Sequence, residues 1–433
     1  MRILFITSRN IIAGDLARVL KQEGNEVKLF IDDKDRKLNF ENIVEKTNNW
    51  KKELNWVRKD GLIVFDDSGY GKIQDKLRKK GYSVFGGNEH SDNLEFDREY
   101  AQKIFQKYGL QILETINFGS IDKCFEFVKK SKKSWVIKQN DHKLNINYVS
   151  QLDDNQDVLD MLEFCKEKHN RKIKSIVIQE KVKGVEVGVG RYFNGKDWVG
   201  PIEINFEHKH LFNGGIGPMT TEMGTLAWYD DDEKNTLFQK TISKLKPYLE
   251  EINFRGDFEV NFIINEDGIF PLEATPRLGS PIIYLQDEIH QSPWGEFMKA
   301  IADSQSFDLK WKRGYGIVVL LAVPPFPYVS NLDEISPKGM GIYFKDIENN
   351  ELSHVYFEGV AKRNLEKRSQ FYVSDGEGYI AYVTGIDETV ESARKKVYNI
   401  VNKIYAPKIF YRDDIGLKFI HNDFNLLKQW GYL

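Results

Sequence analysis

The sequence predicts a multidomain chain of mixed α/β and α+β class. Its 433 residues exceed one ordinary domain of about 150 residues, so two to four domains are expected. Near the N-terminus short apolar runs alternate with helical stretches, whereas toward the C-terminus strands follow one another closely. The first pattern is typical of a parallel sheet and the second of an antiparallel one.

Composition indicates a folded protein that acts on small molecules. Hydrophobic residues make up 41% and charged residues 29%, and the net charge is -3 with no basic cluster, so neither a nucleic acid nor a membrane is an expected partner. No apolar run approaches the roughly 20 residues of a membrane span, and the start MRILFITSR lacks a signal-peptide pattern. We therefore expect a cytoplasmic monomer or homodimer. Cys124 and Cys165 have no metal-ligand spacing and are expected to be reduced thiols.

Three domains are predicted. Residues 1–90 form an N-terminal parallel α/β domain that binds substrate, because the runs RILFI, EVKLFI, GLIVF and YSVFG alternate with helices at 13–23 and 72–80. Residues 91–308 form a second domain, which opens with a single amphipathic helix ending at Gly109 and includes a subdomain at about 115–180. Residues 309–433 form a separate antiparallel α+β domain.

Strands and helices of the last two domains are predicted from alternation and periodicity. The central region has strands at 134–139, 173–179, 185–193 and 198–206, a helix at 233–251, a hairpin at 257–275 and a helix at 294–302. The C-terminal region has strands at 316–322, 341–344, 353–358 and 378–385, and a helix at 389–404.

The segment GDFEVNFIINEDGIFPLEATPRLGSP carries the strongest chemical signal. Alternation along its first strand places Glu259 and Asn261 on one face. If residues 266–268 form a three-residue loop with the glycine in the left-handed conformation, Asn261 lies opposite Glu273 and Glu259 opposite Thr275. Four oxygen donors would then converge, which suits magnesium or manganese beside nucleotide phosphates. The alternative is an exposed hairpin with its polar residues outward.

A second segment, SIVIQEKVKGVEVGVGRYF, outlines a nucleotide pocket. An apolar strand leads into Glu180, breaks at Gly184 and resumes with Glu186. The end of such a strand offers backbone groups to a purine edge, and a nearby carboxylate can accept ribose hydroxyls. Taken singly, either glutamate is better explained as a solvated surface carboxylate. Lys138, after an apolar strand, and Arg98, at the start of a helix, can reach phosphates, although either alone is usually a surface cation.

In their order along the chain these pieces resemble the phosphoribosylamine–glycine ligase (glycinamide ribonucleotide synthetase) family of the ATP-grasp superfamily. The similarity extends through the loop EHKHLFNGGIGPMTTEMG, the segment LEATPRLGSP and the late segment FYRDDIGLKF, so it covers nearly the whole chain. It implies an ATP-grasp fold, with the subdomain at 115–180 as its flap, and an ADP-forming, C–N bond-forming ligase of purine biosynthesis that joins an amino acid to an amine through an acyl phosphate.

The resemblance also implies a role for each matching position. ATP and a divalent cation would be the cofactors. Arg98 and Lys138 match residues for the ATP phosphates, Glu180 and the backbone of Val182 match the adenine contacts, and Glu186 matches the ribose contact. The remaining matches are Glu273 and Thr275 for magnesium, and His208, Lys209, Arg277 and Gly279 near the acyl phosphate and the acceptor.

Departures from the family pattern concern the substrate more than ATP. The glycine-rich opening turn is replaced by ITSRNIIAGD, in which Ser8 and Arg9 can still bind an anion, and the ribose motif by FDDSGYG, in which Asp66 and Asp67 can accept hydroxyls or an ammonium. A turn that caps a helix explains Asp67 equally well. The glycine-rich flap becomes QNDHKLNINYV, and the usual Asn-Thr-Gly-Gly-Met-Gly becomes MTTEMG. In the metal motif Thr275 replaces an Asn, and Ser280 stands where an Asp is expected.

Three functions therefore compete. The first is a carboxylate–amine ligase acting on phosphoribosylamine or a related sugar amine. The second is a paralogue that joins an amino acid to another amine, as in a modified nucleotide or a secondary metabolite. The third is an inactive protein that only binds nucleotide. Retention of Lys138, Glu186, Glu273 and Arg277 favours an active enzyme.

Overall fold

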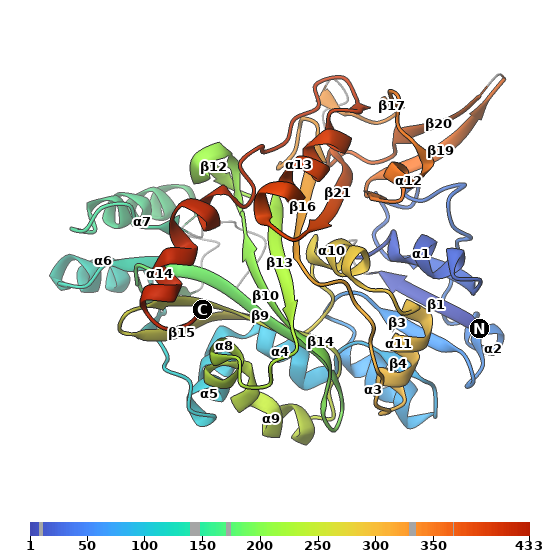
Figure 1. The fold of residues 1–433 in the computed structure, drawn as a ribbon. Coiled ribbons are helices and arrows are strands. Elements are labelled where there is room, and N and C mark those ends of the chain that lie inside the picture. Colours follow the sequence, from blue (N-terminus) through green and yellow to red (C-terminus); the bar gives the residue numbers. More distant parts are fainter. Residues whose placement is uncertain (8–11, 139–147, 170–174, 329–334, 367) are drawn as a thin grey trace.

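The structure is a computed structural model that describes residues 1–7, 12–138, 148–169, 175–328, 335–366 and 368–433 (Figure 1). The predicted anion-binding residues Ser8 and Arg9, and most of the segment that replaces the glycine-rich flap, lie outside these ranges. In the described part of the chain, no helix has both the length and the apolar character that a membrane span requires.

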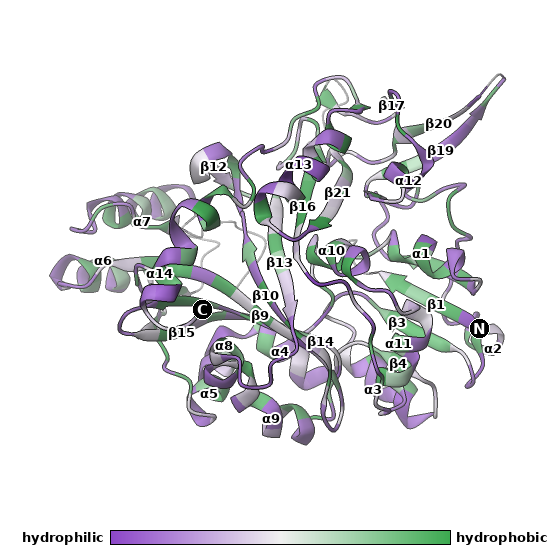
Figure 2. Cartoon of the chain, viewed as in Figure 1, coloured by the Kyte–Doolittle hydropathy of each residue, from purple (hydrophilic) through white to green (hydrophobic). Residues whose placement is uncertain are grey.

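The N-terminal unit is a parallel sheet in the order β2-β1-β3-β4, as predicted. All four residues of β3 are buried, which explains why its sequence is an unbroken apolar run. Figure 2 shows hydrophobic residues along β1 and β3, whereas hydrophilic residues gather on the surrounding surface. The elements are β1 (Arg2–Thr7), α1 (Leu16–Gln22), β2 (Glu26–Ile31), α2 (Leu54–Val57), β3 (Leu62–Phe65), α3 (Gly71–Lys79) and β4 (Val84–Phe85).

The predicted single helix at 91–109 is wrong, because two helices occupy this segment: α4 (Glu89–Phe96) and α5 (Arg98–Lys107). Asp97 between them is extended, with φ -119° and ψ 95°, and its side chain accepts the N–H of Tyr100 at 3.0 Å. An aspartate that caps a new helix in this way cannot also continue the preceding one. Arg98 thereby becomes the first residue of α5.

Residues 115–180 form a small antiparallel sheet in the order β5-β8-β6-β7, covered by two helices. This unit has its own apolar core, to which Trp135, Ile137 and Ile178 belong together with Cys124 and Cys165; both cysteines are buried and unpaired, as predicted. The elements are β5 (Thr115–Phe118), α6 (Ile121–Lys130), β6 (Trp135–Lys138), β7 (Tyr148–Val149), α7 (Gln156–His169) and β8 (Ile176–Glu180).

The centre of the molecule is an antiparallel sheet of eight strands in the order β15-β14-β9-β10-β13-β16-β21-β18. Strand β16, which lies beyond the predicted boundary at residue 309, pairs with β13, so one sheet runs across that boundary. The strands are β9 (Val185–Asn194), β10 (Trp198–Glu207), β13 (Gly224–Asp230), β14 (Arg255–Asn265), β15 (Gly268–Thr275), β16 (Tyr315–Ala322), β18 (Val355–Phe357) and β21 (Tyr379–Asp387).

The predicted helix at 233–251 is also wrong. The segment folds as α8 (Thr236–Lys240), a 3₁₀ turn (Ile242–Leu245) and α9 (Lys246–Glu251). Thr241 interrupts the first helix with φ -121° and ψ -110°, and a proline follows in the first turn of α9, a position that a proline tolerates. Helical periodicity alone does not show such a break.

The remaining elements lie around the central sheet. A short hairpin stands beside it, and a third four-stranded sheet, β19-β20-β17-β22, lies near its far end (Figure 1). The hairpin β19–β20 was not predicted, because RNLEKRSQ shows no alternation of apolar residues. The elements are β11 (His210–Phe212), β12 (Ile216–Met219), α10 (Ile282–Ile289), α11 (Trp294–Ala302), β17 (Gly341–Phe344), α12 (Asn349–Leu352), β19 (Val360–Leu365), β20 (Arg368–Val373), α13 (Val390–Val401), β22 (Ile404–Tyr405) and α14 (Phe424–Gln429).

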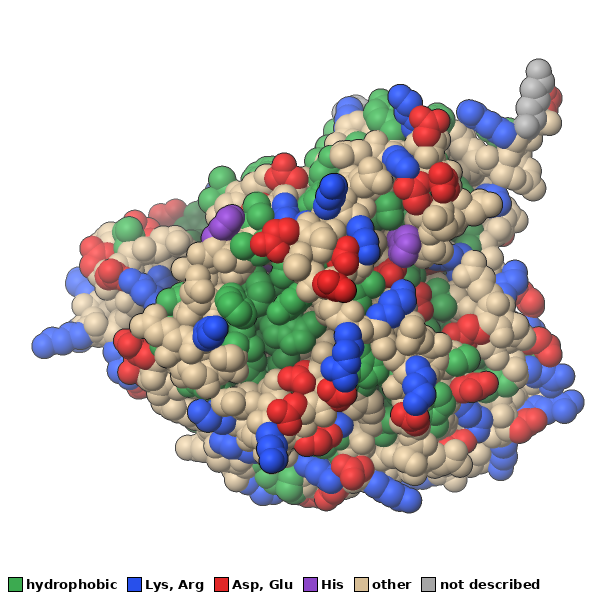
Figure 3. Space-filling view, in the orientation of Figure 1, with side chains coloured by type: hydrophobic (Ala, Val, Ile, Leu, Met, Phe, Trp, Pro, Cys, Tyr) green, Lys and Arg blue, Asp and Glu red, His purple; other side chains and the backbone are tan. Residues whose placement is uncertain are grey.

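On the face shown in Figure 3, acidic and basic side chains are interspersed, and hydrophobic side chains gather in a hollow near the centre. Aromatic rings from two strands and the C-terminal region pack together in the core: the ring centroids of Phe206 and Trp228 are 5.7 Å apart, and those of Phe206 and Phe419 are 4.7 Å apart. These contacts join the C-terminal residues to the central sheet.

The cap at Asp97 gives a first prediction. We expect Asp97→Ala to lower the free energy of local opening of α5 by about 1 kcal/mol, because one helix N–H loses its acceptor. Amide hydrogen exchange in α5 should then be roughly fivefold faster. Asp97→Asn keeps an acceptor and should exchange as the wild type does. Equal exchange in the alanine variant would show that the cap contributes nothing.

Candidate active site

A cavity of about 1150 Å³ lies between the small sheet and the β14–β15 end of the central sheet. It is larger than the roughly 300–1000 Å³ of ordinary small-molecule pockets, so it has room for a nucleotide and a second substrate. Most of the predicted site residues line it: Arg98, Lys138, Glu180, Val182, Glu186, Lys209, Glu259, Asn261, Glu273, Thr275, Arg277 and Gly279.

The β14–β15 hairpin has the predicted pairing, although for a different reason. Asn261 lies opposite Glu273 and Glu259 opposite Thr275. The turn, however, contains two residues, because Asn265 pairs with Gly268, and the additional residue is a bulge at position 272. The bulge shifts the register by one, so the oxygen-bearing side chains of both strands still reach the cavity.

Lys209 is the electrostatic centre of the cavity wall. Its Nζ lies 2.8 Å from Glu186, 2.9 Å from Glu207 and 3.3 Å from Glu273. Burial lowers the pKa of Lys209, but the three carboxylates outweigh it and hold that pKa well above its usual value. In turn Lys209 lowers the pKa of Glu273 to about 2. This ammonium is therefore a permanent counter-ion among three strands.

Two further cations face Glu273 from the other side of the cavity. Arg98 Nη2 is 3.8 Å from a Glu273 oxygen. Lys138, at the end of β6, lies close enough to lower the pKa of Glu273 as well. Burial and the charge of Arg98 lower the pKa of Lys138 to about 8, so this lysine is charged at pH 7 but loses its proton more easily than an ordinary lysine.

A group of buried acids lies behind the hairpin, and the sequence prediction missed most of it. Asn205 Nδ2 donates to Glu203 at 2.9 Å and to Glu259 at 2.7 Å, and Gln286 of α10 donates to Glu203 at 2.7 Å and to Asp257 at 3.2 Å. Burial and mutual repulsion raise the pKa of Glu203 and of Asp257 to about 7. The alternation of Glu203, Asn205 and Glu207 along β10 was a signal that could have revealed it.

The hairpin also offers oxygen to a metal ion. Asn261 is 2% exposed, and its Oδ1 has no hydrogen-bond partner in the described part of the chain, while its Nδ2 donates to Glu207 at 3.1 Å. An amide oxygen beside Glu273, Glu259 and Thr275 fits a hard cation such as magnesium or manganese. Among the described residues, no three acids or histidines form a complete metal cage, since Lys209 stands between the carboxylates.

Glu180 and Val182 lie at the end of β8, where the strand enters the cavity. The Glu180 carboxylate pairs with Lys133 at 2.9 Å, so its side chain is turned toward the small sheet. Within the ranges described, the Val182 N–H has no hydrogen-bond partner and remains available to a ligand. A free main-chain donor at a strand end is what recognition of a purine edge requires.

Arg277 is held between the hairpin and the N-terminal unit. It donates to Glu95 from Nε at 3.2 Å and from Nη2 at 3.0 Å, and its Nε lies 3.6 Å from Asp67. Burial lowers the pKa of Arg277, but these two acids more than compensate. The predicted substrate residue Asp67 is therefore an ion partner of a predicted catalytic residue.

Asp66 and His208 do not form part of the cavity wall, contrary to expectation. Asp66 is fully buried and accepts the N–H of Ala13 at 3.0 Å; burial and neighbouring Asp67 raise its pKa to about 8. His208 bridges two loops, since Gly416 donates to its Nε2 and its Nδ1–H points to the carbonyl of Gly224, both at 3.2 Å. Burial and Arg412 lower the pKa of His208 to about 4, so it stays neutral and has a structural position.

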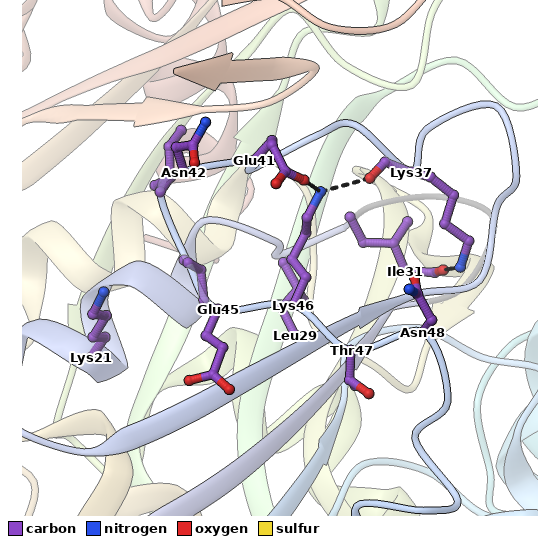
Figure 4. Close-up of a pocket in the computed structure, with 12 residues that line it drawn as sticks. Lys21, Leu29, Ile31, Lys37, Glu41, Asn42, Glu45, Lys46, Thr47 and Asn48 are labelled. Atoms are coloured by element: carbon purple, nitrogen blue, oxygen red, sulfur yellow. Dashed lines mark hydrogen bonds and ion pairs between the residues drawn. The ribbon is translucent and has the colours of Figure 1, made fainter. Parts of the chain in front are cut away.

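A second cavity, of about 560 Å³, lies beside β2 in the N-terminal unit (Figure 4). Lys46 projects into it, but the ammonium of Lys46 already pairs with Glu41 and donates to the carbonyl of Lys37 at 2.7 Å. Lys37 in turn donates to the carbonyl of Ile31. Because Lys37 and Lys46 are engaged by the chain itself, this cavity lacks the convergent chemistry of the larger one.

Comparison with known proteins agrees with the geometry. Residues 96–282 match the family model of the phosphoribosylglycinamide synthetase ATP-grasp (A) domain. The phosphoribosylamine–glycine ligase of Clostridium acetobutylicum is 26% identical over 372 residues, 79% of this chain and 81% of that one. The crystal structure of phosphoribosylamine–glycine ligase from Thermotoga maritima has a TM-score of 0.68 at 20% identity, covering 96% of this chain and 100% of that one. A biotin carboxylase–β-γ-ATP complex from Campylobacter jejuni has a TM-score of 0.65 at 13% identity, covering 98% of each chain.

The fold is therefore the ATP-grasp fold, with an N-terminal parallel α/β unit, and the predicted fold class is confirmed. Within this class, residues 96–282 are similar to the ATP-grasp (A) domain of phosphoribosylglycinamide synthetases, and most of the chain is similar to phosphoribosylamine–glycine ligases, in agreement with the sequence resemblance.

The counter-ion role of Lys209 gives a second prediction. Lys209→Met should lower the free energy of unfolding at pH 7 by about 2–3 kcal/mol, because three carboxylates lose their cation, two of them with partial solvent access. The lowered pKa of Glu273 stabilises the folded wild type only where carboxylates of the unfolded chain are ionised, which is above pH about 4.5. Below that pH this contribution is progressively lost, so the difference in stability between wild type and variant should shrink. Denaturant unfolding across pH measures this, with Lys209→Arg as the charge-preserving control; a deficit independent of pH would contradict the electrostatic explanation.

Proposed function

We propose that this protein is an ADP-forming, ATP-dependent carboxylate–amine ligase. The observation that carries the proposal is the meeting, across one cavity, of two cations from the small sheet side, Lys138 and Arg98, with the oxygen-bearing hairpin that holds Glu273. Cations that neutralise transferring phosphates, opposite oxygen ligands for a divalent cation, are what phosphoryl transfer requires.

In this proposal the nucleotide lies between the small sheet and the central sheet. The free N–H of Val182 faces the purine, Glu186 accepts a ribose hydroxyl, and Lys138 and Arg98 bind phosphate oxygens. Glu273 and the Asn261 amide oxygen would hold the divalent cation, with Glu259 and Thr275 beside them. When bound, that cation would neutralise phosphate charge.

The reaction has two group transfers. A substrate carboxylate oxygen attacks the γ-phosphorus of ATP, the bond to the bridging oxygen breaks, and ADP leaves. An amine nitrogen then attacks the carbonyl carbon of the acyl phosphate; the C–N bond forms, the C–O bond to phosphate breaks, and the nitrogen loses a proton. The chain itself orients the reactants: Arg277 and Lys209 flank the cavity as fixed positive charges near the developing oxyanions.

Glycine and phosphoribosylamine are the first substrate pair to test, because related proteins are named for them. A different amine is the second candidate. It is favoured by the burial of Asp66, which leaves the N-terminal unit without one of the two acids predicted to bind a sugar. In the third candidate, an inactive protein, Lys138 and Arg98 opposite Glu273 would serve nucleotide binding alone, so only turnover separates it from the first two.

Nucleotide binding gives the third prediction. Mg-ATP at millimolar concentration should raise the melting temperature, because it binds the native state and not the unfolded chain. ATP with a chelator should not raise it, because the proposed site binds the nucleotide together with a divalent cation. ADP release should then depend on both a carboxylate and an amine in a screen of amino acids and amines. Binding without substrate-dependent ADP release would favour the inactive alternative, and no thermal shift would contradict the proposed site.

The fourth prediction concerns pH. Because the pKa of Lys138 is lowered to about 8, its side chain is mostly charged at pH 7 and mostly neutral at pH 9. The Kd for Mg-ATP should therefore rise about tenfold over that interval. Lys138→Arg remains charged throughout and should bind with little pH dependence. Calorimetric titration at several pH values measures both; equal pH profiles for the two proteins would exclude Lys138 as a phosphate ligand.

A further inference from the structure

Part of the cavity wall lies away from the hairpin and has a different chemistry. Thr221, Phe326 and Tyr379 come together there: Thr221 Oγ1 lies 3.4 Å from the Tyr379 hydroxyl, and the rings of Phe326 and Tyr379 pack edge to face with centroids 4.8 Å apart. Aromatic faces and edges of this kind contact carbon skeletons and leave polar recognition to few groups.

Glu222, the next residue after Thr221, also lines the cavity, and its position is tightly fixed. The main chain before it is bound by Lys209, since Thr220 N–H donates to the Lys209 carbonyl at 2.8 Å. The main chain after it is bound by His208, since the Met223 N–H donates to the carbonyl of His208 at 2.8 Å. The Thr225 hydroxyl donates to the Glu222 carboxylate itself. Glu222 thus stands on a rigid segment.

The Glu222 carboxylate is 4% exposed, and within the described ranges it forms no ion pair. The cations nearest this wall already have acidic partners. Lys209 pairs with three carboxylates, and Arg277 pairs with Glu95. Buried Arg36, which lies over the Tyr379 ring, pairs with Glu358 at 2.9 Å and with Asp375 at 3.2 Å. Burial, and after it the charge of Glu207, raises the pKa of the Glu222 carboxyl well above its usual value, which favours the protonated form until a cation reaches it. This side chain is therefore suited to a ligand that brings positive charge and N–H donors.

A primary amine fits these features better than a sugar hydroxyl or an acid does. An ammonium group has three donors and a positive charge, whereas a second carboxylate would be repelled by neighbouring Glu207, whose charge already acts on Glu222. The carbon atoms next to the amino group would contact Phe326 and Tyr379.

We infer that Glu222 receives the amino group of the acceptor substrate, and that the acceptor is a primary amine with an apolar or aromatic group close to the nitrogen. This inference rests on the proposed ligase function and adds a substrate class and a specificity-determining residue to it. Glu222 acts here on binding, so its loss should raise the KM for the amine and leave the KM for ATP unchanged.

The experiment uses the full chain loaded with magnesium and a non-hydrolysable ATP analogue, titrated calorimetrically with 2-phenylethylamine and with 2-phenylethanol. The wild type should prefer the amine by about tenfold or more, because a charge-assisted hydrogen bond is lost in the alcohol. Glu222→Gln should weaken amine binding by about 10- to 100-fold, leave alcohol binding unchanged and so remove the preference. Glu222→Asp should restore part of it.

Glu288→Gln is the matched control, because Glu288 is also a buried carboxylate but does not line this cavity. It should keep the full preference for the amine. Absence of nucleotide-analogue binding in the wild type would overturn the proposed function itself. If the analogue binds but the wild type shows no preference for the amine, or Glu222→Gln retains it, the inference about Glu222 alone is overturned.

Discussion

The cavity depends on one interaction, the placement of the Lys209 ammonium among Glu186, Glu207 and Glu273. These acids come from β9, β10 and β15, so the polar face of the central sheet concentrates negative charge at one place. Without an internal cation, their mutual repulsion and partial burial would oppose pairing of the strands that carry them. The Lys209 ammonium offsets this repulsion, because it pairs with all three acids. The sheet can therefore form part of the core and still present oxygen atoms to the cavity.

The same arrangement explains why charge in the cavity is divided between two sides. Lys209 compensates the acids of the central sheet, whereas Lys138 and Arg98 approach from β6 and α5; among the described residues, the one ion pair that either of them forms is that of Arg98 with Glu273. Burial and the charge of Arg98 lower the pKa of Lys138. Positive charge is thus left over for an anionic ligand on one side, while the other side keeps oxygen atoms, such as Asn261 Oδ1, without donors.

Much of this could be predicted from sequence wherever a local pattern decides the structure. The parallel unit follows from apolar runs, and the placement of Glu259 and Asn261 on the cavity face of one strand follows from alternation. The prediction failed where a single residue or a distant contact decides. Asp97 ends one helix by capping the next, and the bulge in β15 compensates a turn shorter than expected. The sharing of Asn205 between Glu203 and Glu259 depends on strands far apart in the chain, so no local pattern contains it.

The departures from the family motifs lie mainly in segments that would contact the substrates, whereas most of the residues that would contact ATP are retained. The residues that we propose to face the phosphates are fixed by the compensation of charge around Glu273, so that changing one of them disturbs several strands at once. Glu222 lies in MTTEMG, at a position where the resembling motif has glycine, and it is anchored only through its own loop and Thr225. Glu222 is not among the three carboxylates that pair with Lys209, so a change at this position leaves those ion pairs in place. Divergence of the acceptor is therefore compatible with retention of the residues proposed to face the phosphates.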